Sequence, residues 1–175
     1  MRTVIAICGS DGDDPSLCPE VLEIAENVGY LAALRGAVIM CGGGGGVMEQ
    51  ACRGAKRADG LVIGILPETK SYGNPYIDIG LTTHLGRARN YILVRSADAV
   101  IGIAGRWGTL NELALALNVG KPTALVQGSG GWVDMLASNH VAQLVSQFPT
   151  RPMVASSAEE AVRLVFEAIA LNEVE

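Results

Sequence analysis

The sequence predicts an α/β fold: a doubly wound, mostly parallel sheet with helices on both faces. Three observations support this prediction. Short apolar runs alternate along the chain with stretches of helical periodicity, the order that is typical of a parallel sheet covered by helices. Glycine-rich turns follow three of these runs. Hydrophobic residues make up 49% of the chain but aromatic residues only 5%, which indicates a core of Val, Ile, Leu and Ala.

Seven apolar runs are expected as strands because each is short, rich in β-branched residues and bounded by turn residues. They span residues 3–8, 37–41, 61–66, 77–81, 99–103, 123–126 and 153–154. Apolar residues at helical spacing predict helices over residues 19–34 and about 86–96. Ser157 and Glu160 have the spacing of a capping box that opens the last helix.

Length, hydropathy and charge narrow the class of protein. The 175 residues are close to the usual size of one core, so we expect residues 1–175 to form one domain. No apolar run reaches the roughly 20 residues that span a bilayer, and the apolar N-terminal run lacks a cleavage site. We therefore expect a cytoplasmic protein with no membrane partner.

A net charge of −5 and a pI near 5.0 argue against a nucleic-acid partner, because a protein that binds nucleic acid needs a basic surface.

Metal and cofactor chemistry is not expected from the sequence. The four cysteines, Cys8, Cys18, Cys41 and Cys52, show no CxxC or Cys/His ligand spacing, and the two histidines stand alone. We therefore expect neither a metal site nor a cofactor.

The strongest functional signal is a pair of glycine-rich turns, at residues 41–48 and 102–112, each between an expected strand and an expected helix. Glycine lets the backbone approach a ligand closely, and the following helix directs unpaired N–H groups at that ligand. The turn at residues 9–12 reaches the same rim, because ligands of such sheets lie beyond the carboxyl ends of the strands. The residues expected to bind a phosphate-bearing ligand are Gly9, Ser10, Gly43, Gly44, Gly45, Gly46, Val47, Met48, Gly105, Arg106, Gly108 and Thr109.

Acidic residues and two irregular segments surround these turns. Asp11, Asp13 and Asp14 would repel phosphate unless they face away or bind ribose hydroxyls. Clusters of Gly, Pro, Asn and Ser predict loops over residues 67–76 and 127–131, and both are candidates to cover a site. Neither glycine-rich turn is a Walker P-loop, because no Gly-Lys-Ser/Thr sequence follows the glycines.

Arg89 lies between the two turns and has two interpretations. It heads the apolar stripe of Ile92, Leu93 and Ser96 on the helix expected over residues 86–96, which directs it into the rim of the sheet. Alternatively, it is a surface arginine held by a salt bridge.

Glu112 also has two interpretations. Thr109 and Glu112 have the spacing of a capping box with Thr109 as the N-cap, and such a box needs no function. An apolar stripe on the helix that follows the second turn is expected to face the core. This leaves Glu112 beside the glycines, where its carboxyl group can contact a sugar of the ligand. That stripe is Leu110, Leu113, Ala114 and Leu117. The motif alone does not choose between the two interpretations.

Together these motifs resemble the Lonely Guy (LOG) family of phosphoribohydrolases and the wider Rossmann-like superfamily that includes molybdenum-cofactor carrier proteins. The resemblance runs from residue 3 to about residue 126. Residues 42–48 and 64–67 are similar to the Gly-rich turn and the Gly-Val-Ile-Pro strand of the family. Residues 104–112 are similar to its Pro-Gly-Gly-x-Gly-Thr-x-x-Glu signature.

This resemblance implies a nucleotide-binding, Rossmann-like domain with an enzyme activity. Active members cleave the N-glycosidic bond of a nucleoside 5′-monophosphate and release free base and ribose 5-phosphate. They are homo-oligomers built on dimers, and the reaction requires no metal or redox cofactor. By resemblance, Arg89 and Glu112 are the catalytic residues. In that role Glu112 stabilises an oxocarbenium-like centre and orients water, while Arg89 holds the substrate.

Three departures from the family pattern leave a second interpretation open. Ala104 stands at the signature proline, Arg106 at its second glycine, and Asn90 at the lysine that usually follows the catalytic arginine. The Arg89-Asn90 pair is similar to a branch nearer the cofactor carriers. The main prediction is a phosphoribohydrolase, and the alternative is a non-catalytic carrier or sensor of a phosphate-bearing nucleotide or of molybdenum cofactor.

We predict that the protein forms a homodimer or a higher homo-oligomer. The resemblance implies self-association, and the helix after the second turn has apolar residues at Leu115 and Ala116 beyond its expected core stripe. Sedimentation at micromolar concentration should give a species of at least twice the chain mass. A species of 18.2 kDa alone would contradict this prediction.

Overall fold

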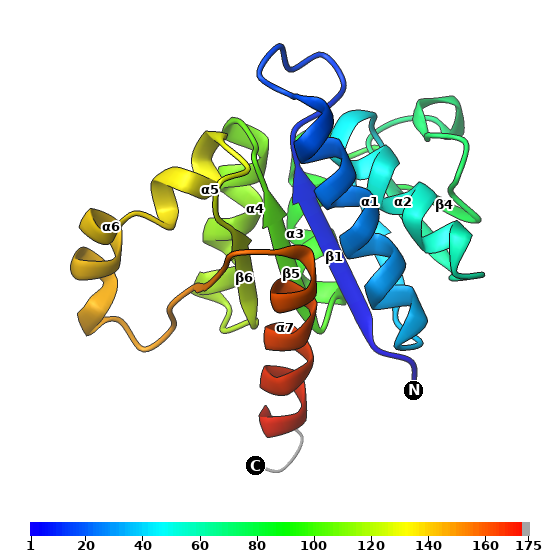
Figure 1. Ribbon diagram of the computed structural model, residues 1–175. Coiled ribbons are helices and arrows are strands. Elements are labelled where there is room, and N and C mark those ends of the chain that lie inside the picture. The colour runs from blue at the N-terminus through cyan, green and yellow to red at the C-terminus, as the bar shows by residue number, and fades with distance from the viewer. Residues whose placement is uncertain (173–175) are drawn as a thin grey trace.

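The computed structural model describes residues 1–172 and confirms the predicted fold class. One sheet of seven parallel strands has the order β4-β3-β2-β1-β5-β6-β7 (Figure 1). The strands are β1 (Val4–Gly9), β2 (Val38–Cys41), β3 (Val62–Leu66), β4 (Ile79–Thr82), β5 (Ala99–Ile103), β6 (Thr123–Val126) and β7 (Met153–Ala155). Every strand expected from the sequence is present, with small differences at the ends.

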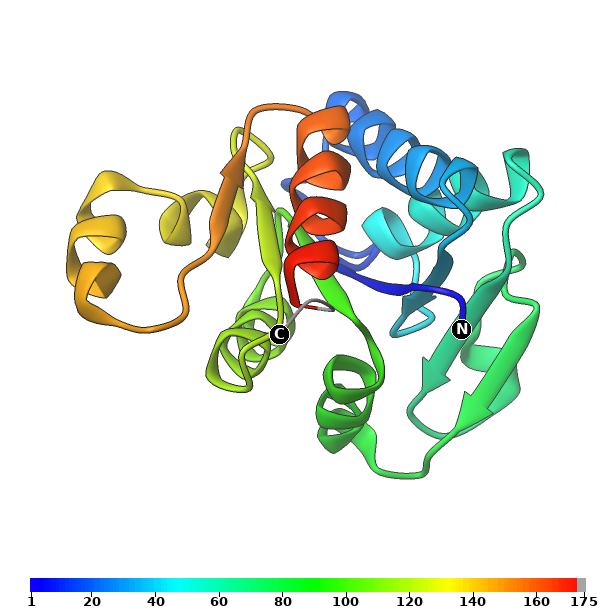
Figure 2. The ribbon, with the colours of Figure 1, turned by 90° about the horizontal axis from the view of Figure 1, so that it is seen from below.

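Helices cover both faces of the sheet. The helices are α1 (Pro19–Leu34), α2 (Gly46–Arg57), α3 (Arg89–Ser96), α4 (Trp107–Asn118), α5 (Gly131–Leu136), α6 (Asn139–Leu144) and α7 (Ala158–Asn172). The view from below shows α1, α2 and α7 on one face and α3 and α4 on the other (Figure 2). The helix predicted over residues 19–34 is confirmed. The helix predicted over 86–96 begins as a 3-10 turn, η2 (Gly86–Ala88), that leads into α3.

Two further 3-10 turns, η1 (Lys70–Tyr72) and η3 (Val145–Gln147), lie in the connecting segments. The first falls inside the loop expected over residues 67–76. None of the helices in residues 1–172 has both the length and the apolar character needed to cross a membrane.

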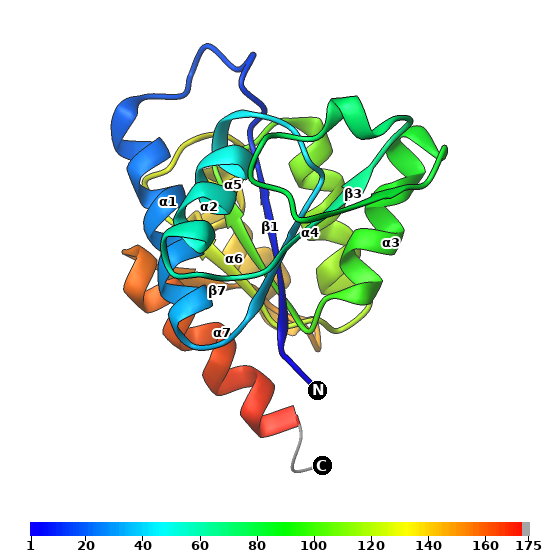
Figure 3. The same cartoon turned by 90° about the vertical axis from the view of Figure 1, so that its right-hand side faces the viewer.

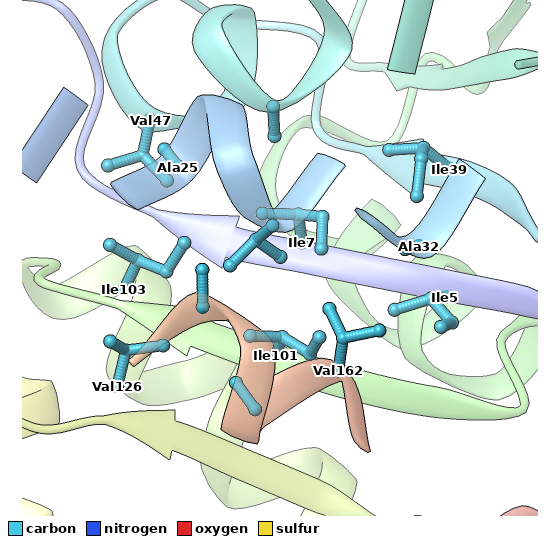
Figure 4. Packing of buried hydrophobic residues seen from close by; sticks show 14 of the residues in the cluster. Ile5, Ile7, Ala25, Ala32, Ile39, Val47, Ile101, Ile103, Val126 and Val162 are labelled. Atoms are coloured by element: carbon cyan, nitrogen blue, oxygen red, sulfur yellow. The ribbon is translucent and has the colours of Figure 1, made fainter. Parts of the chain in front are cut away.

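β1 is buried on both sides, which explains its unbroken apolar sequence. Ile5 and Ile7 point to the face covered by α1 and α7, while Ala6 and Cys8 point to the opposite face. Figure 4 shows Ile5 and Ile7 in one cluster with Ile101 of β5. Burial of each such side chain stabilises the fold by about 1.5–3 kcal/mol. The central strands therefore hold the loops at their carboxyl ends in fixed places.

The turn after β5 differs from the prediction made for it. α4 begins at Trp107 with Arg106 as its N-cap, so Thr109 is not the N-cap and the expected capping box does not form. Ala104 and Gly105 have φ angles of 53° and 102°, and this left-handed turn starts the helix earlier than expected. Because the φ of proline is fixed near −65°, a proline cannot adopt the conformation of Ala104.

The core face of α4 is also rotated relative to the expected stripe. The buried residues of this helix are Thr109, Leu113 and Ala116. Leu113 lies over Gly102 of β5, which leaves room for it and sets the rotation of the helix. Ala114 is exposed, contrary to expectation, and Leu110 and Leu117 are partly exposed. Of the two apolar residues beyond the expected stripe, Ala116 belongs to the core and Leu115 is partly exposed.

The capping box at the start of α7 is confirmed with a shift of one residue. The Glu160 N–H donates to Ser157 Oγ at 3.2 Å. The Glu160 carboxylate accepts bonds from the N–H and the Oγ of Ser156 at 2.8 and 2.7 Å. The box therefore closes on the residue before the N-cap.

α1 and α2 approach each other closely through two glycines. A Cβ atom added at Gly29 would overlap the carbonyl group of Ala51, and one added at Gly54 would overlap that of Glu26. Because α2 begins at the end of the first glycine-rich turn, this contact positions that turn relative to β1.

We predict that Gly54→Ala lowers the free energy of unfolding by about 1–3 kcal/mol in urea denaturation. The new methyl group meets backbone, which cannot move aside without separating the two helices, and this cost exceeds the gain in helix propensity. Glu23→Ala, at an exposed position of α1, is the control and should change the free energy by less than about 0.5 kcal/mol. A Gly54→Ala variant as stable as the wild type would exclude the close contact.

Candidate functional site

A cavity opens where the strand order reverses. β1 lies between β2 and β5, and the sheet grows outward from it in both directions, so the loops after β1 and β5 diverge. Figure 1 shows these loops at the top of the sheet, the end opposite the N-terminus. The cavity, called the switch cavity below, has a volume of about 430 Å³. It is lined by Gly9, Ser10, Asp11, Asp13, Met48, Tyr72, Arg87, Arg89, Asn90, Arg106, Trp107, Gly108, Thr109 and Glu112.

Ser10 holds the loops after β1 and β5 together. Its Oγ accepts a hydrogen bond from the Gly105 N–H at 2.9 Å and donates one to the Asp14 carboxylate at 2.6 Å. Ser10 is only 2% exposed, so the loss of either bond would leave a buried polar group unsatisfied. Burial raises the pKa of Asp14, but the bonds from Ser10 and Ser16 outweigh it and hold this pKa below its usual value. Asp14 is therefore ionised at neutral pH.

The glycine-rich turn before α2 is filled by an acidic side chain of the protein itself. Oδ1 of Asp11 accepts hydrogen bonds from the N–H groups of Gly45 and Gly12, both at 2.8 Å. The Val47 N–H donates to the carbonyl oxygen of Ser10 at 3.0 Å. A carboxylate of the chain thus occupies the place at the N-terminus of α2 that an anionic ligand would take.

The loop over residues 67–76 closes the same turn from the other side. The side-chain amide of Asn74 donates to the carbonyl oxygens of Gly43 and Gly44 at 3.3 and 3.1 Å. The Tyr72 hydroxyl donates to Oδ2 of Asp11 at 3.3 Å, and Tyr72 lines the switch cavity. This loop therefore reaches the cavity through Tyr72.

The N-terminus of α4 faces the switch cavity. Its N-cap residue, Arg106, makes no side-chain capping bond. Trp107, Gly108 and Thr109, the first three residues of the helix, all line the cavity. The first N–H groups of a helix have no partners within it and carry partial positive charge. α4 rather than α2 therefore offers a helix N-terminus to an anion.

Arg89 brings a fixed positive charge to the cavity. Its guanidinium donates to three backbone carbonyls, those of Ile65 at 2.9 Å, Gly86 at 3.0 Å and Gly42 at 3.4 Å. These bonds join β3, η2 and the end of β2, and they hold the guanidinium in one position. Its carbon Cζ also lies 6.0 Å from the ring centre of Tyr72, at the edge of cation–π range.

Arg106 brings a second positive charge that is free to change partners. It pairs with Asp13 at the mouth of the cavity, and its Nε lies 3.8 Å from Asp14. Half of the Arg106 side chain and three quarters of the Asp13 side chain are exposed. Exposed pairs of this kind contribute about 0–1 kcal/mol. The exchange of Asp13 for a ligand anion therefore costs little.

Glu112 lies at the floor of the cavity against Cys8, the buried thiol near the end of β1. Burial raises the pKa of Glu112 to about 7, although a hydrogen bond with Cys8 and the charge of Arg89 act in the opposite direction. Burial and the neighbouring Glu112 raise the pKa of the Cys8 thiol. Near neutral pH the Glu112 carboxyl is therefore partly protonated, and Cys8 is a thiol.

The structure gathers part of the predicted site in the switch cavity. The predicted residues that line it are Gly9, Ser10, Met48, Arg89, Arg106, Gly108, Thr109 and Glu112. Those that do not line it are Gly43, Gly44, Gly45, Gly46, Val47 and Gly105. The lining residues outside the predicted set are Asp11, Asp13, Tyr72, Arg87, Asn90 and Trp107. Arg87 and Asn90 flank Arg89 and Trp107 lies inside the second turn, so proximity to the motifs was the available signal.

The described part of the chain, residues 1–172, contains no group of three or more His, Cys, Asp and Glu side chains that could hold a metal ion.

Comparisons with known proteins give one family model and one curated relative. The model of the SLOG cluster4 family matches residues 2–162. An uncharacterised protein of Archaeoglobus fulgidus is 48% identical over 105 residues, which cover 60% of this chain and 70% of that protein.

Two solved structures share the fold over almost the whole chain. One is the molybdenum cofactor binding protein of the phototrophic bacterium Rippkaea orientalis, with 37% identity and a TM-score of 0.83 over 97% of this chain and 98% of that one. The other is the Moco carrier protein of Chlamydomonas reinhardtii, with 28% identity and a TM-score of 0.83 over 98% and 99%.

We predict that Glu112→Gln raises the free energy of unfolding at pH 8 and changes it little at pH 4.5. The pKa of Glu112 is about 7 in the folded state against 4.5 in the unfolded chain, so the folded state binds more protons between these values. Its contribution to stability therefore falls as the pH rises from 4.5 to 7, by about 1–3 kcal/mol. Glutamine cannot ionise and escapes this loss.

Urea denaturation of both proteins at pH 4.5 and pH 8 measures this difference. Glu159→Gln, on the first turn of α7, is the control and should show no comparable pH-dependent gain. An equal effect of Glu112→Gln at the two pH values would contradict the raised pKa.

Proposed function

We propose that this chain, which belongs to the SLOG cluster4 family, binds a phosphate-bearing small molecule in the switch cavity and carries it without cleaving it. We further propose that the ligand is of the class of the molybdenum cofactor, a pterin that carries a phosphate. One observation carries the proposal: the open N-terminus of α4 and the side chains of Arg89 and Arg106 line a single cavity.

The phosphate is placed against the first turn of α4. The N–H groups of Gly108 and Thr109 and the dipole of the helix favour an anion there. Arg106 leaves Asp13 to supply a charge-assisted hydrogen bond to the phosphate, since its surface pair is weak. Arg89 adds a charge that needs no reorganisation, because backbone carbonyls already hold it.

One observation favours a carrier over a phosphoribohydrolase. The two solved relatives named above, which match almost the whole chain, are described as a molybdenum cofactor binding protein and a Moco carrier protein.

The phosphoribohydrolase is the second candidate, and a specific observation supports it. Arg89 and Glu112, the residues that the family resemblance assigns to catalysis, line the same cavity, and the charge of Arg89 acts on Glu112. A hydrolase and a carrier thus share the same phosphate site and differ in the role of one carboxyl group.

We predict that the purified protein binds a phosphate-bearing pterin and that Arg106→Ala weakens this binding about 10- to 100-fold. The loss corresponds to one charge-assisted hydrogen bond. Isothermal titration calorimetry measures both affinities. Arg163→Ala is the matched control, because Arg163 pairs with Glu160 and Glu167 on its own helix and lines neither the switch cavity nor its mouth, and it should leave the affinity unchanged. Equal affinity of Arg106→Ala and wild type, or no binding by wild type, would argue against the site.

We predict that the wild-type protein releases no free base from nucleoside 5′-monophosphates, as followed by chromatography of the products. The decisive contrary result is base release that Glu112→Gln lowers by about 100-fold while nucleotide affinity is retained. That result would replace the carrier with the hydrolase and would leave the phosphate site intact.

A further inference from the structure

A second cavity continues from the switch cavity along the outer side of the molecule. It lies between α3 and α4, which run side by side (Figure 3), and has a volume of about 430 Å³, within the usual range of small-molecule sites. Arg87, Asn90, Trp107 and Gly108 line both cavities, so the two are continuous. We call this second cavity the α3–α4 groove. A single ligand can therefore occupy both parts of the site.

The walls of the α3–α4 groove are aromatic and apolar. Trp107 and Tyr91 line it and are 68% and 54% exposed, although such side chains bury large areas when they are given a partner. Leu115 of α4 contributes a further apolar surface. The ring of Trp132 packs against Trp107 with the centres 5.0 Å apart and the planes at 50°, which supports the indole. The groove thus presents a supported aromatic surface beside the first turn of α4.

Two joined amides complete the groove. Nδ2 of Asn90 donates to Oδ1 of Asn111 at 3.0 Å, and both residues line the groove. Asn90 is 4% exposed, so its side chain is held in place by its surroundings. Amide groups both donate and accept hydrogen bonds. They therefore match the edge of a planar heterocycle, which carries donors and acceptors in one plane.

We propose that the α3–α4 groove binds the fused nitrogen heterocycle of the ligand whose phosphate lies in the switch cavity. The heterocycle stacks on Trp107, and the amides of Asn90 and Asn111 contact its edge. Trp107 is the first residue of α4, so the aromatic surface and the phosphate site belong to the same helical turn. This inference rests on the proposed phosphate site and adds to it the part of the ligand that sets specificity.

The test compares two probes, a phosphate-bearing pterin and ribose 5-phosphate, by calorimetry on the 175-residue chain. The first probe carries both the phosphate and the heterocycle, and the second lacks the heterocycle. Trp107→Ala should weaken pterin phosphate binding about 10- to 100-fold, as expected for the loss of one stacked ring, and change the affinity for ribose 5-phosphate by less than about twofold. Trp107→Phe should restore most of the lost affinity.

A matched control and a spectroscopic measurement accompany these titrations. Phe148→Ala removes another exposed aromatic side chain that lines neither cavity, and it should leave both affinities unchanged. Pterin phosphate should quench tryptophan fluorescence in the wild type and in Phe148→Ala, and the quenching should be smaller in Trp107→Ala, which retains Trp132.

The outcomes separate the groove from the phosphate site. An equal loss of affinity for both probes in Trp107→Ala would overturn the stacking role of Trp107, because the substitution would then act through the start of α4. Equal affinities of the wild type for ribose 5-phosphate and pterin phosphate would also contradict binding of the heterocycle in the groove. The proposed phosphate site would be unaffected by that result. Failure of both probes to bind the wild type would overturn both proposals. A change of sedimentation in Trp107→Ala without a change of affinity would assign the groove to a second copy of the chain.

Discussion

The hydrogen bond from the Gly105 N–H to Ser10 Oγ is the contact on which the site depends. It joins the loops that follow β1 and β5 at the one place where the sheet reverses its direction of growth. Asp14 fixes the hydroxyl that accepts this bond, since its carboxylate accepts a second hydrogen bond from Ser10 Oγ. With both loops tied at this point, the turn that starts α4 is held open toward the cavity. The side chains of β1 are buried alternately on the two faces of the sheet, and this strand is the rigid base for the arrangement.

The two glycine-rich turns have different roles although their sequences suggest the same one. The Asp11 carboxylate lies at the N-terminus of α2 and accepts a hydrogen bond from the Gly45 N–H, so the first turn already has an anionic partner within the chain. Among residues 1–172, no carboxylate is bonded to the N-terminus of α4 in this way, and this N-terminus opens into the cavity beside Arg89 and Arg106. This division explains how a chain with a net charge of −5 can offer a local site for an anion. The acidic residues after β1 all have partners within the chain: Asp11 and Asp14 accept hydrogen bonds, and Asp13 pairs with Arg106.

The strands and most helices were predictable because their signal is local: an apolar run bounded by turn residues identifies β1 or β5 without knowledge of its neighbours. The start of α4 was not, since it depends on a left-handed backbone at Ala104, which alanine rarely adopts. The bond between Asp11 and Gly45 joins residues 34 positions apart, and no local pattern indicates it. Arg89 and Glu112 were selected from spacing and resemblance, whereas the pKa of Glu112 depends on burial that only the fold provides.

In the proposed site, the anion binds at the N-terminus of α4 and not at that of α2. The most direct test is a titration of isotope-labelled protein with a phosphate-bearing pterin, followed by the chemical shifts of the backbone amides. The amide signals of Gly108 and Thr109 should move, and those of Gly45 and Gly12 should stay, because Asp11 already holds the latter pair. Large shifts at Gly45 and Gly12 with none at Gly108 and Thr109 would place the anion at α2 and contradict the site proposed at α4.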